Sequence, residues 1–99
     1  MADAASALAG LRAEVDAIDE RLAMLLALRF EKTDALGICK ALLGEEPRDA
    51  QRQLQRQRLL QALVERHRLP AELVFELYRC ISAEAVVRHR AAGCRGGGA

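Results

Sequence analysis

The sequence predicts an all-α protein of three helices, one of them very long, and three observations support this class. Apolar residues recur every three or four positions along most of the chain, which is the period of an amphipathic helix. Only two short segments carry Gly or Pro in positions that would end a helix. With two Pro, two Phe, one Tyr and no Trp in 99 residues, the interior must be built mainly from Leu, Ala, Val and Ile.

The first predicted helix covers residues 5–43 and is unusually long. Its only interior glycines are Gly10 and Gly37, and Gly44 is a natural C-terminal stop. Its length would be near 55 Å, at about 1.5 Å per residue. Two shorter helices of the same chain cannot cover so long an apolar stripe, so a second copy packed alongside is the simplest solution. The stripe consists of Leu8, Leu11, Val15, Ile18, Leu22 and Leu25.

The second and third predicted helices are separated by a short break. Asp49 is placed to cap a helix over residues 50–67, and the segment HRLP ends it. Pro70 suits the first turn of a third helix that runs to about residue 92. The expected apolar faces are Leu54, Leu59, Leu60, Leu63 and Val64, and then Leu73, Val74, Leu77, Tyr78, Ile81 and Ala85.

The chain is therefore predicted to be one helical domain over residues 1–92. The remaining residues, 93–99, are rich in glycine, have nothing to pack against, and are expected to form a disordered tail.

Composition narrows the function classes. The formal charge of +1, with acids and bases interspersed, argues against a nucleic-acid or membrane-surface protein. No apolar segment is long enough to span a bilayer or resembles a secretory leader, and the odd set of three cysteines suits reduced thiols, so a cytoplasmic protein is expected. Cys39 is expected to be an inert core cysteine and His67 a helix-capping residue, with no metal site.

Two cations interrupt the apolar stripe of the long helix. Arg29 stands on the next step of the stripe after Leu25, and Lys40 follows eleven residues later, close to three whole turns. Both side chains therefore point the same way. Because an unpartnered buried cation is very costly, the pair indicates an anionic ligand or permanent carboxylate partners.

At this point the sequence resembles a known family, the all-helical chorismate mutases, which also include isochorismate-pyruvate lyases and aminodeoxychorismate mutases. The resemblance covers about residues 8–90. It is carried by the segment LRAEVDAIDERLAMLLALR, by the later PRDAQRQ, and above all by the ordered set Arg12, Arg29, Lys40, Asp49 and Arg52. It implies an intertwined three-helix homodimer, an isomerase that converts chorismate to prephenate, and no cofactor or metal.

The resemblance also implies roles for individual residues. Arg12 from the partner chain and Arg29 would clamp carboxylates of the substrate, and Lys40 would reach the ether oxygen and one carboxylate. Arg52 would support the substrate electrostatically, Gln53 would bond the ring hydroxyl, and Asp49 would contribute through its backbone.

The spacing along the helix agrees with an Arg12 that acts across the interface. Arg12 lies seventeen residues before Arg29, which is about 25 Å along the helix and roughly 100° off its face. The two cannot touch one small molecule from the same chain. The alternative for Arg12 is an ion pair with Asp16 on its own helix.

Two positions of the third helix depart from the family pattern. Ala85 stands where many members offer a small hydroxyl residue, so that contact is lost. His89 stands where they offer Gln or Glu against the ether oxygen. His89 can donate an N–H there in either protonation state, more strongly as imidazolium, which predicts activity that rises as the pH falls.

Three function classes stay open from the sequence. The first is the chorismate mutase reaction. The second is the same scaffold acting on isochorismate or 4-amino-4-deoxychorismate, although the neutral Gln53 favours a ring hydroxyl over an ammonium group. The third is a non-catalytic helical dimerisation module. Because short members of the family are in some cases activated by a partner enzyme, the resemblance also allows such a partner here.

Overall fold

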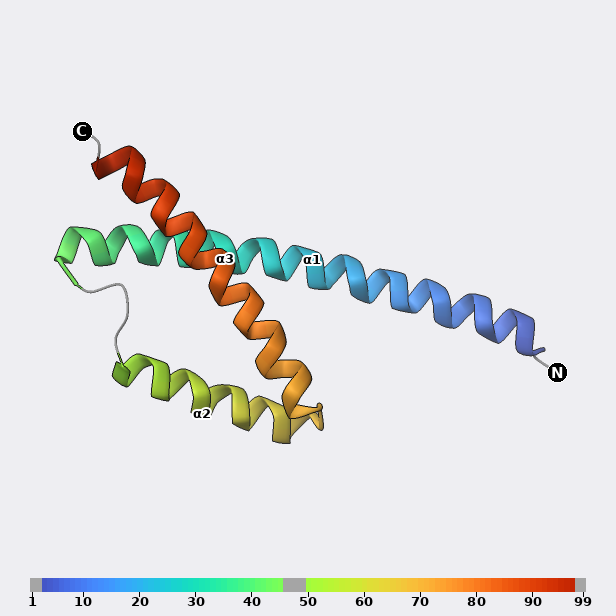
Figure 1. Cartoon of the computed structure of the whole chain (residues 1–99). Coiled ribbons are helices and arrows are strands. Elements are labelled where there is room, and N and C mark those ends of the chain that lie inside the picture. Colours follow the sequence, from blue (N-terminus) through green and yellow to red (C-terminus); the bar gives the residue numbers. More distant parts are fainter. Residues whose placement is uncertain (1–2, 46–49, 98–99) are drawn as a thin grey trace. The chain divides into compact units, whose positions relative to one another are not determined.

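A computed structural model of the chain describes residues 3–45 and 50–97, and in these residues it contains three α-helices and no strand. Helix α1 spans Ala4–Leu43, α2 spans Ala50–His67 and α3 spans Ala71–Gly97 (Figure 1). The predicted all-α class is confirmed. The first two helices also begin and end within one residue of their predicted limits, 5–43 and 50–67.

The chain divides into two compact units, residues 1–32 and residues 33–99. The first unit is the N-terminal part of α1. The second contains the last turns of α1 together with α2 and α3. Each unit is described by itself below.

Both ends of α1 carry capping structures. At its start, the Asp3 side chain accepts a hydrogen bond from the backbone N–H of Ser6 at 2.6 Å, as an N-cap residue does. At its end, Gly44 has φ of 71°. Its N–H donates to the carbonyl of Ala41 at 3.2 Å, and the next N–H, of Glu45, donates to the carbonyl of Lys40 at 2.9 Å. This pair of bonds is a Schellman motif, so Gly44 ends the helix as predicted.

Helix α2 also ends at a residue of positive φ, but this residue is not a glycine. Arg68 follows the last residue of α2 with φ of 54°, a left-handed conformation that non-glycine residues seldom adopt. The N–H of Leu69 donates to the carbonyl of Val64 at 3.0 Å. Pro70 was predicted inside the first turn of the third helix, but it lies just before α3 and its carbonyl accepts the N–H of Val74 at 3.2 Å.

The core of the second unit lies where α2 packs on α3. Its most buried side chain is Val74, with 5% of its surface exposed, and it packs with Leu60 and Val64. Leu63 and Tyr78 lie against this cluster, as expected. The predicted faces are only partly confirmed, because two helices bury only the strip along their contact. The expected core residues that remain exposed are Leu54, Leu59, Leu73 and Leu77.

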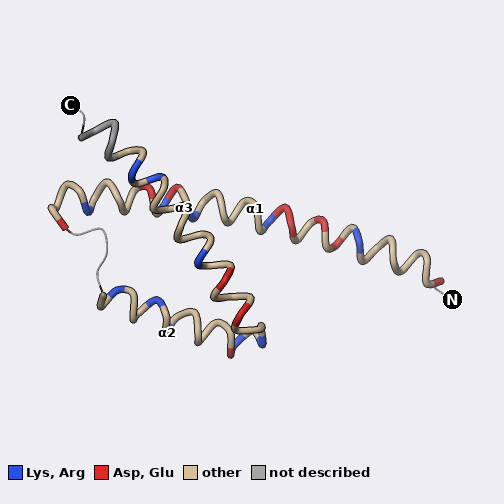
Figure 2. Tube along the Cα trace, viewed as in Figure 1, with Lys and Arg blue, Asp and Glu red and all other residues tan. Residues whose placement is uncertain are grey.

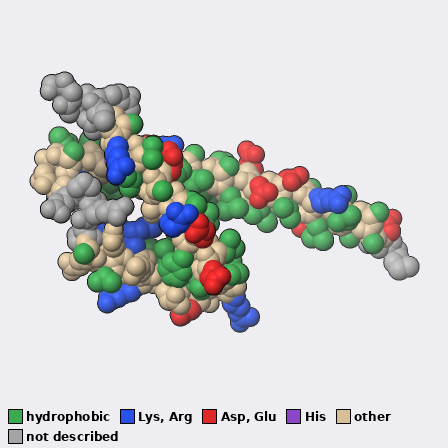
Figure 3. Space-filling model, in the orientation of Figure 1, with side chains coloured by type: hydrophobic (Ala, Val, Ile, Leu, Met, Phe, Trp, Pro, Cys, Tyr) green, Lys and Arg blue, Asp and Glu red, His purple; other side chains and the backbone are tan. Residues whose placement is uncertain are grey.

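The apolar stripe of the first unit is exposed in the single chain. From Leu8 to Leu25 its six side chains keep 48% to 60% of their surface accessible. In Figure 3 hydrophobic side chains run along this part of α1. A soluble chain rarely leaves so continuous an apolar surface uncovered, so the stripe is a surface that a further packing partner would bury.

Helix α3 continues further than predicted. The sequence predicts an end near residue 92, whereas the helix runs to Gly97. Each added helical residue closes one more backbone hydrogen bond, so a helix can extend past its last packed turn even through glycine. Within the described residues, no helix combines the length and the apolar content needed to cross a membrane.

Candidate active site

Helix α1 carries three of the residues that the sequence singles out. In the first unit, Arg12 is exposed and Arg29 is half-buried. In the second unit, Lys40 is half-buried in the last turn of the helix. The alternative ion pair between Arg12 and Asp16 is not formed in the part of the chain that the structure describes. Figure 2 shows both cations and carboxylates on each of the three helices.

The start of α2 presents two further predicted residues. Arg52 and Gln53 lie in the first turn and are exposed. The Arg52 Nη1 donates to Oε1 of Gln55 at 3.3 Å on the same helix. Because the first N–H groups of a helix lack partners and carry the positive end of its dipole, this turn favours an anion. Asp49, the predicted cap, lies outside the described residues.

Helix α3 carries two predicted residues, Ala85 and His89, and His89 contacts the last turns of α1. Ala85 and His89 are both half-buried. Nε2 of His89 lies 2.8 Å from the backbone carbonyl oxygen of Thr33. The ring also lies directly against Gly37, where an added Cβ would sit 2.6 Å from Nε2. Thr33 and Gly37 therefore belong to the surroundings of the predicted site. One signal for this contact is present in the sequence, because Gly37 is a glycine inside a helix whose backbone does not require it.

A second contact between α3 and the same segment of α1 is ionic. Nη1 of Arg88 lies 3.1 Å from Oδ2 of Asp34, and Nε lies 3.3 Å from Oε2 of Glu84, one turn earlier on α3. The other carboxylate oxygen, Oδ1 of Asp34, is buried and accepts no hydrogen bond from the described residues. Asp34 and Arg88 were not identified from the sequence, because residues 54 positions apart show no local pattern.

A groove of about 820 Å³ lies between α2 and α3. Its apolar wall includes Leu60, Phe75 and Tyr78, and Arg56 lies 6.0 Å above the ring of Tyr78. Of the predicted site residues only Gln53 lines it, so this groove is not the place where Lys40 and His89 lie. Three arginines line it: Arg56, Arg79 and Arg90.

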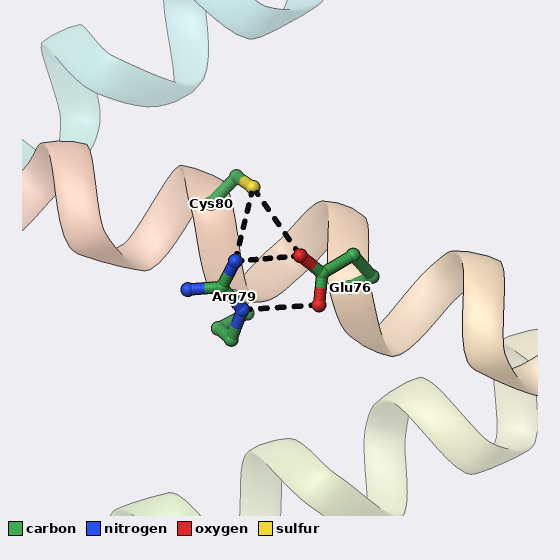
Figure 4. Close-up of polar contacts among 3 residues, drawn as sticks. All are labelled: Glu76, Arg79 and Cys80. Atoms are coloured by element: carbon green, nitrogen blue, oxygen red, sulfur yellow. Dashed lines mark hydrogen bonds and ion pairs between the residues drawn. The ribbon is translucent and has the colours of Figure 1, made fainter.

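Arg79 belongs to an exposed cluster on α3 (Figure 4). It donates two hydrogen bonds to the carboxylate of Glu76, at 3.0 and 2.5 Å, and its Nη2 lies 3.8 Å from Sγ of Cys80. These hydrogen bonds and the opposite charges lower the pKa of Glu76 and raise the pKa of Arg79. Since both side chains are more than 60% exposed, the pair adds little to stability.

The structure describes the side chains of two cysteines, Cys39 and Cys80. Cys39 was expected to be an inert residue of the packed face, but its side chain is exposed, as is that of Cys80. Nothing in the part of the chain that the structure describes buries this side of α1 at Cys39. Among the described residues, no group of three or more His, Cys, Asp or Glu side chains could hold a metal ion.

Comparison with known proteins places the chain in a family. The family model described as chorismate mutase type II matches residues 11–90. A search of curated proteins finds no significant match. The matched range includes all eight predicted site residues, from Arg12 to His89.

Proposed function

Because this chain belongs to the chorismate mutase type II family, we propose that it rearranges chorismate to prephenate. The observation that carries the proposal is the match over residues 11–90 together with two half-buried cations, Arg29 and Lys40, on one helix of the matched region. Side chains on an apolar stripe are normally uncharged. A dicarboxylate ligand would explain the two cations, because it supplies the opposite charge.

The reaction requires no nucleophile and no proton transfer. In chorismate the ether C–O bond breaks while a C–C bond forms, within one cyclic movement of electrons, and negative charge develops on the ether oxygen. The catalyst must hold the substrate in its folded, chair-like form and stabilise that charge. Positioned cations and hydrogen-bond donors can do both.

The two cations of α1 are proposed to hold the ends of the substrate. The planar fork of Arg29 suits bidentate pairing with a carboxylate. The ammonium of Lys40 is a compact donor that can serve both a carboxylate and the ether oxygen. By helix geometry their backbones stand about 16 Å apart along the axis, and both side chains are long enough to converge on a molecule between them.

The other predicted residues are proposed to complete the pocket. Arg52 and the free N–H groups at the start of α2 add positive potential, and Gln53 bonds the ring hydroxyl. Asp49 contributes through its backbone. Ala85 leaves space without a hydrogen bond, and His89 donates to the ether oxygen.

We propose that the active form is a homodimer. The exposed stripe of the first unit, 48% to 60% accessible from Leu8 to Leu25, supports a second copy as the packing partner. In that dimer Arg12 reaches the substrate bound by the other chain, because on its own chain it lies about 25 Å from Arg29 along the helix. Each site would then need both chains.

Mixing two inactive variants tests this arrangement. In a heterodimer of Arg12→Ala and Arg29→Ala chains, one site keeps its own Arg29 and receives a native Arg12 from the partner. We expect about a quarter of the parental activity after equal amounts are unfolded and refolded together, since half of the dimers are mixed and each has one complete site. Each variant refolded alone is the control. If Arg12 acts within its own chain, the mixture stays as inactive as its components.

The reaction itself is tested by parallel assays of the purified chain with chorismate, isochorismate and 4-amino-4-deoxychorismate. Prephenate as the main product supports the proposal. Salicylate and pyruvate, or a rearranged amino compound, would keep the same site and change the substrate. The absence of turnover with all three would favour the helical dimerisation module. Activation by a partner enzyme stays a prediction of the resemblance.

A further inference from the structure

Two neighbouring residues of α3, Arg88 and His89, attach this helix to the last turns of α1. Arg88 pairs with Asp34 at 3.1 Å, and Nε2 of His89 lies 2.8 Å from the carbonyl oxygen of Thr33. The ion pair is about two-fifths exposed on both sides, so it adds little energy. The histidine contact is part-buried and has a defined geometry.

The space for the imidazole ring is provided by Gly37. A Cβ at this position would lie 2.6 Å from Nε2, 2.7 Å from Cδ2 and 3.1 Å from Cε1 of His89. Such approaches are too short for a real side chain. The positive φ values of the described residues occur at Gly44 and Arg68, so the backbone at Gly37 does not itself require glycine. Glycine also weakens a helix relative to alanine. The absence of a side chain at Gly37 allows the His89 ring to lie close to the backbone of α1.

The contact with Thr33 determines which ring nitrogen carries the proton. A carbonyl oxygen only accepts hydrogen bonds, so Nε2 of His89 must be the donor. A neutral imidazole has one N–H, which leaves Nδ1 as a bare acceptor. The imidazolium form keeps the Nε2 hydrogen bond and adds a second N–H at Nδ1.

We infer that Gly37 and the carbonyl of Thr33 are positioning elements that fix His89 with its proton on Nε2, so that Nδ1 is the ring nitrogen left for the substrate. Such an Nδ1 donates only when the ring is charged. This rests on the proposed function, in which His89 donates to the ether oxygen, and it narrows the expectation from the sequence that either protonation state would serve. The neutral ring would face the developing negative charge with a lone pair.

Both packed segments, the last turns of α1 and the facing part of α3, carry charged residues. The last turns of α1, from Thr33 to Leu43, carry Asp34 and Lys40, and the facing part of α3 carries Glu84, Arg88 and Arg90. Both carboxylates pair with Arg88. The described polar partner of the ring is a neutral carbonyl, the backbone oxygen of Thr33.

The first test is independent of activity. Imidazole 15N and 1H spectra of the full chain should show His89 as a single Nε2–H tautomer at high pH, with a slowly exchanging Nε2 proton. The exposed His67 is the internal control and should exchange fast. In Gly37→Ala the slow proton of His89 should be lost. A parent His89 that exchanges as fast as His67, or that carries its proton on Nδ1, overturns the inference.

The second test uses the pH dependence of turnover. The kcat of the parent should rise as the pH falls, whereas His89→Gln, whose amide donates at any pH, should give a flat profile. Gly37→Ala should lose about 10²-fold in kcat at the acidic end, the usual effect of removing one transition-state donor. Gly10→Ala is the matched control, because a Cβ at this other interior glycine of α1 meets nothing within 4 Å.

These tests distinguish a failure of the proposed function from a failure of the inference about His89. If none of the three substrates is turned over, the proposed function fails, while the spectra still decide whether the ring is fixed. If chorismate is turned over with a flat pH profile in the parent, or if Gly37→Ala behaves like Gly10→Ala, the inference fails and the proposed function stands. Alanine is the better helix former, so circular dichroism of both glycine variants should show full helicity.

Discussion

Replacing Arg29 or Lys40 by alanine is expected to lower kcat/KM for chorismate by about 10³-fold, because each change removes a charge-assisted contact of roughly 3–4 kcal/mol in the transition state. The same variants should bind a dicarboxylate transition-state analogue much more weakly. The unfolding midpoint of Lys40→Ala in urea should hold or rise, since alanine favours the helix and the change removes a charge from an apolar stripe. Steady-state kinetics and urea titrations on the same preparations measure both effects.

The chain offers a matched control for each cation. Arg21 and Lys32 also lie on α1 and are exposed, so Arg21→Ala and Lys32→Ala remove the same charges from positions off the proposed site. Activity should stay within about twofold of the parent, the range of an ordinary surface change. If the control variants lose as much activity as Arg29→Ala and Lys40→Ala, the loss reflects net charge and the proposed site is wrong. A parallel loss of stability and activity would instead make the two cations structural.

Replacing Leu22 by aspartate is expected to prevent dimer formation and with it all activity. Leu22 lies in the middle of the exposed stripe of the first unit, with 59% of its surface accessible in the single chain. In the proposed dimer each chain would bury an unpaired carboxylate at this position, at a cost of about 3 kcal/mol or more per chain. Sedimentation equilibrium and circular dichroism would show a monomer with reduced helicity.

The control for this experiment places the same residue on the other side of the helix. Ala13 lies nine residues before Leu22, which is close to half a turn away in angle. Ala13→Asp should therefore sediment as the parent does. A Leu22→Asp chain that remains dimeric, or an Ala13→Asp chain that dissociates to the same extent, would show that the stripe is not the dimer interface.

Local signals in the sequence were sufficient for most of the fold. The step of three and four residues from Leu8 to Leu25 predicts the long helix, and Gly44 marks its end because glycine adopts the required positive φ without strain. The end of α2 was located by the HRLP segment, although the left-handed residue there is Arg68, which carries no sequence signature of that conformation. The extent of α3 was underestimated, since glycine lowers helix propensity without forbidding a helix.

The candidate site was also predictable from the sequence only in part. Arg29 and Lys40 could be recognised because they are charged residues at positions where the period of the helix predicts apolar ones. The residues that contact the His89 ring could not be recognised in this way. Its contacts with Thr33 and Gly37 join residues 56 and 52 positions apart, and the sequence alone shows Gly37 only as a glycine that the helix does not require. The prediction that Cys39 lies in the packed face was wrong, because its side chain is exposed. Its burial depends on which segment covers this part of α1, and the period of one helix does not determine that.

The sequence by itself determined the helices of this protein, their limits to within a few residues, and the two cations that point to an anionic ligand, because helical period, caps and charge on a stripe are local properties of the chain. Only the tertiary structure decided which side chains of α2 and α3 form the core, that α3 is attached to α1 through Arg88 and His89, and that Nε2 of His89 lies 2.8 Å from the carbonyl oxygen of Thr33. These features depend on distances between segments remote in sequence, and no periodicity within one helix encodes such distances.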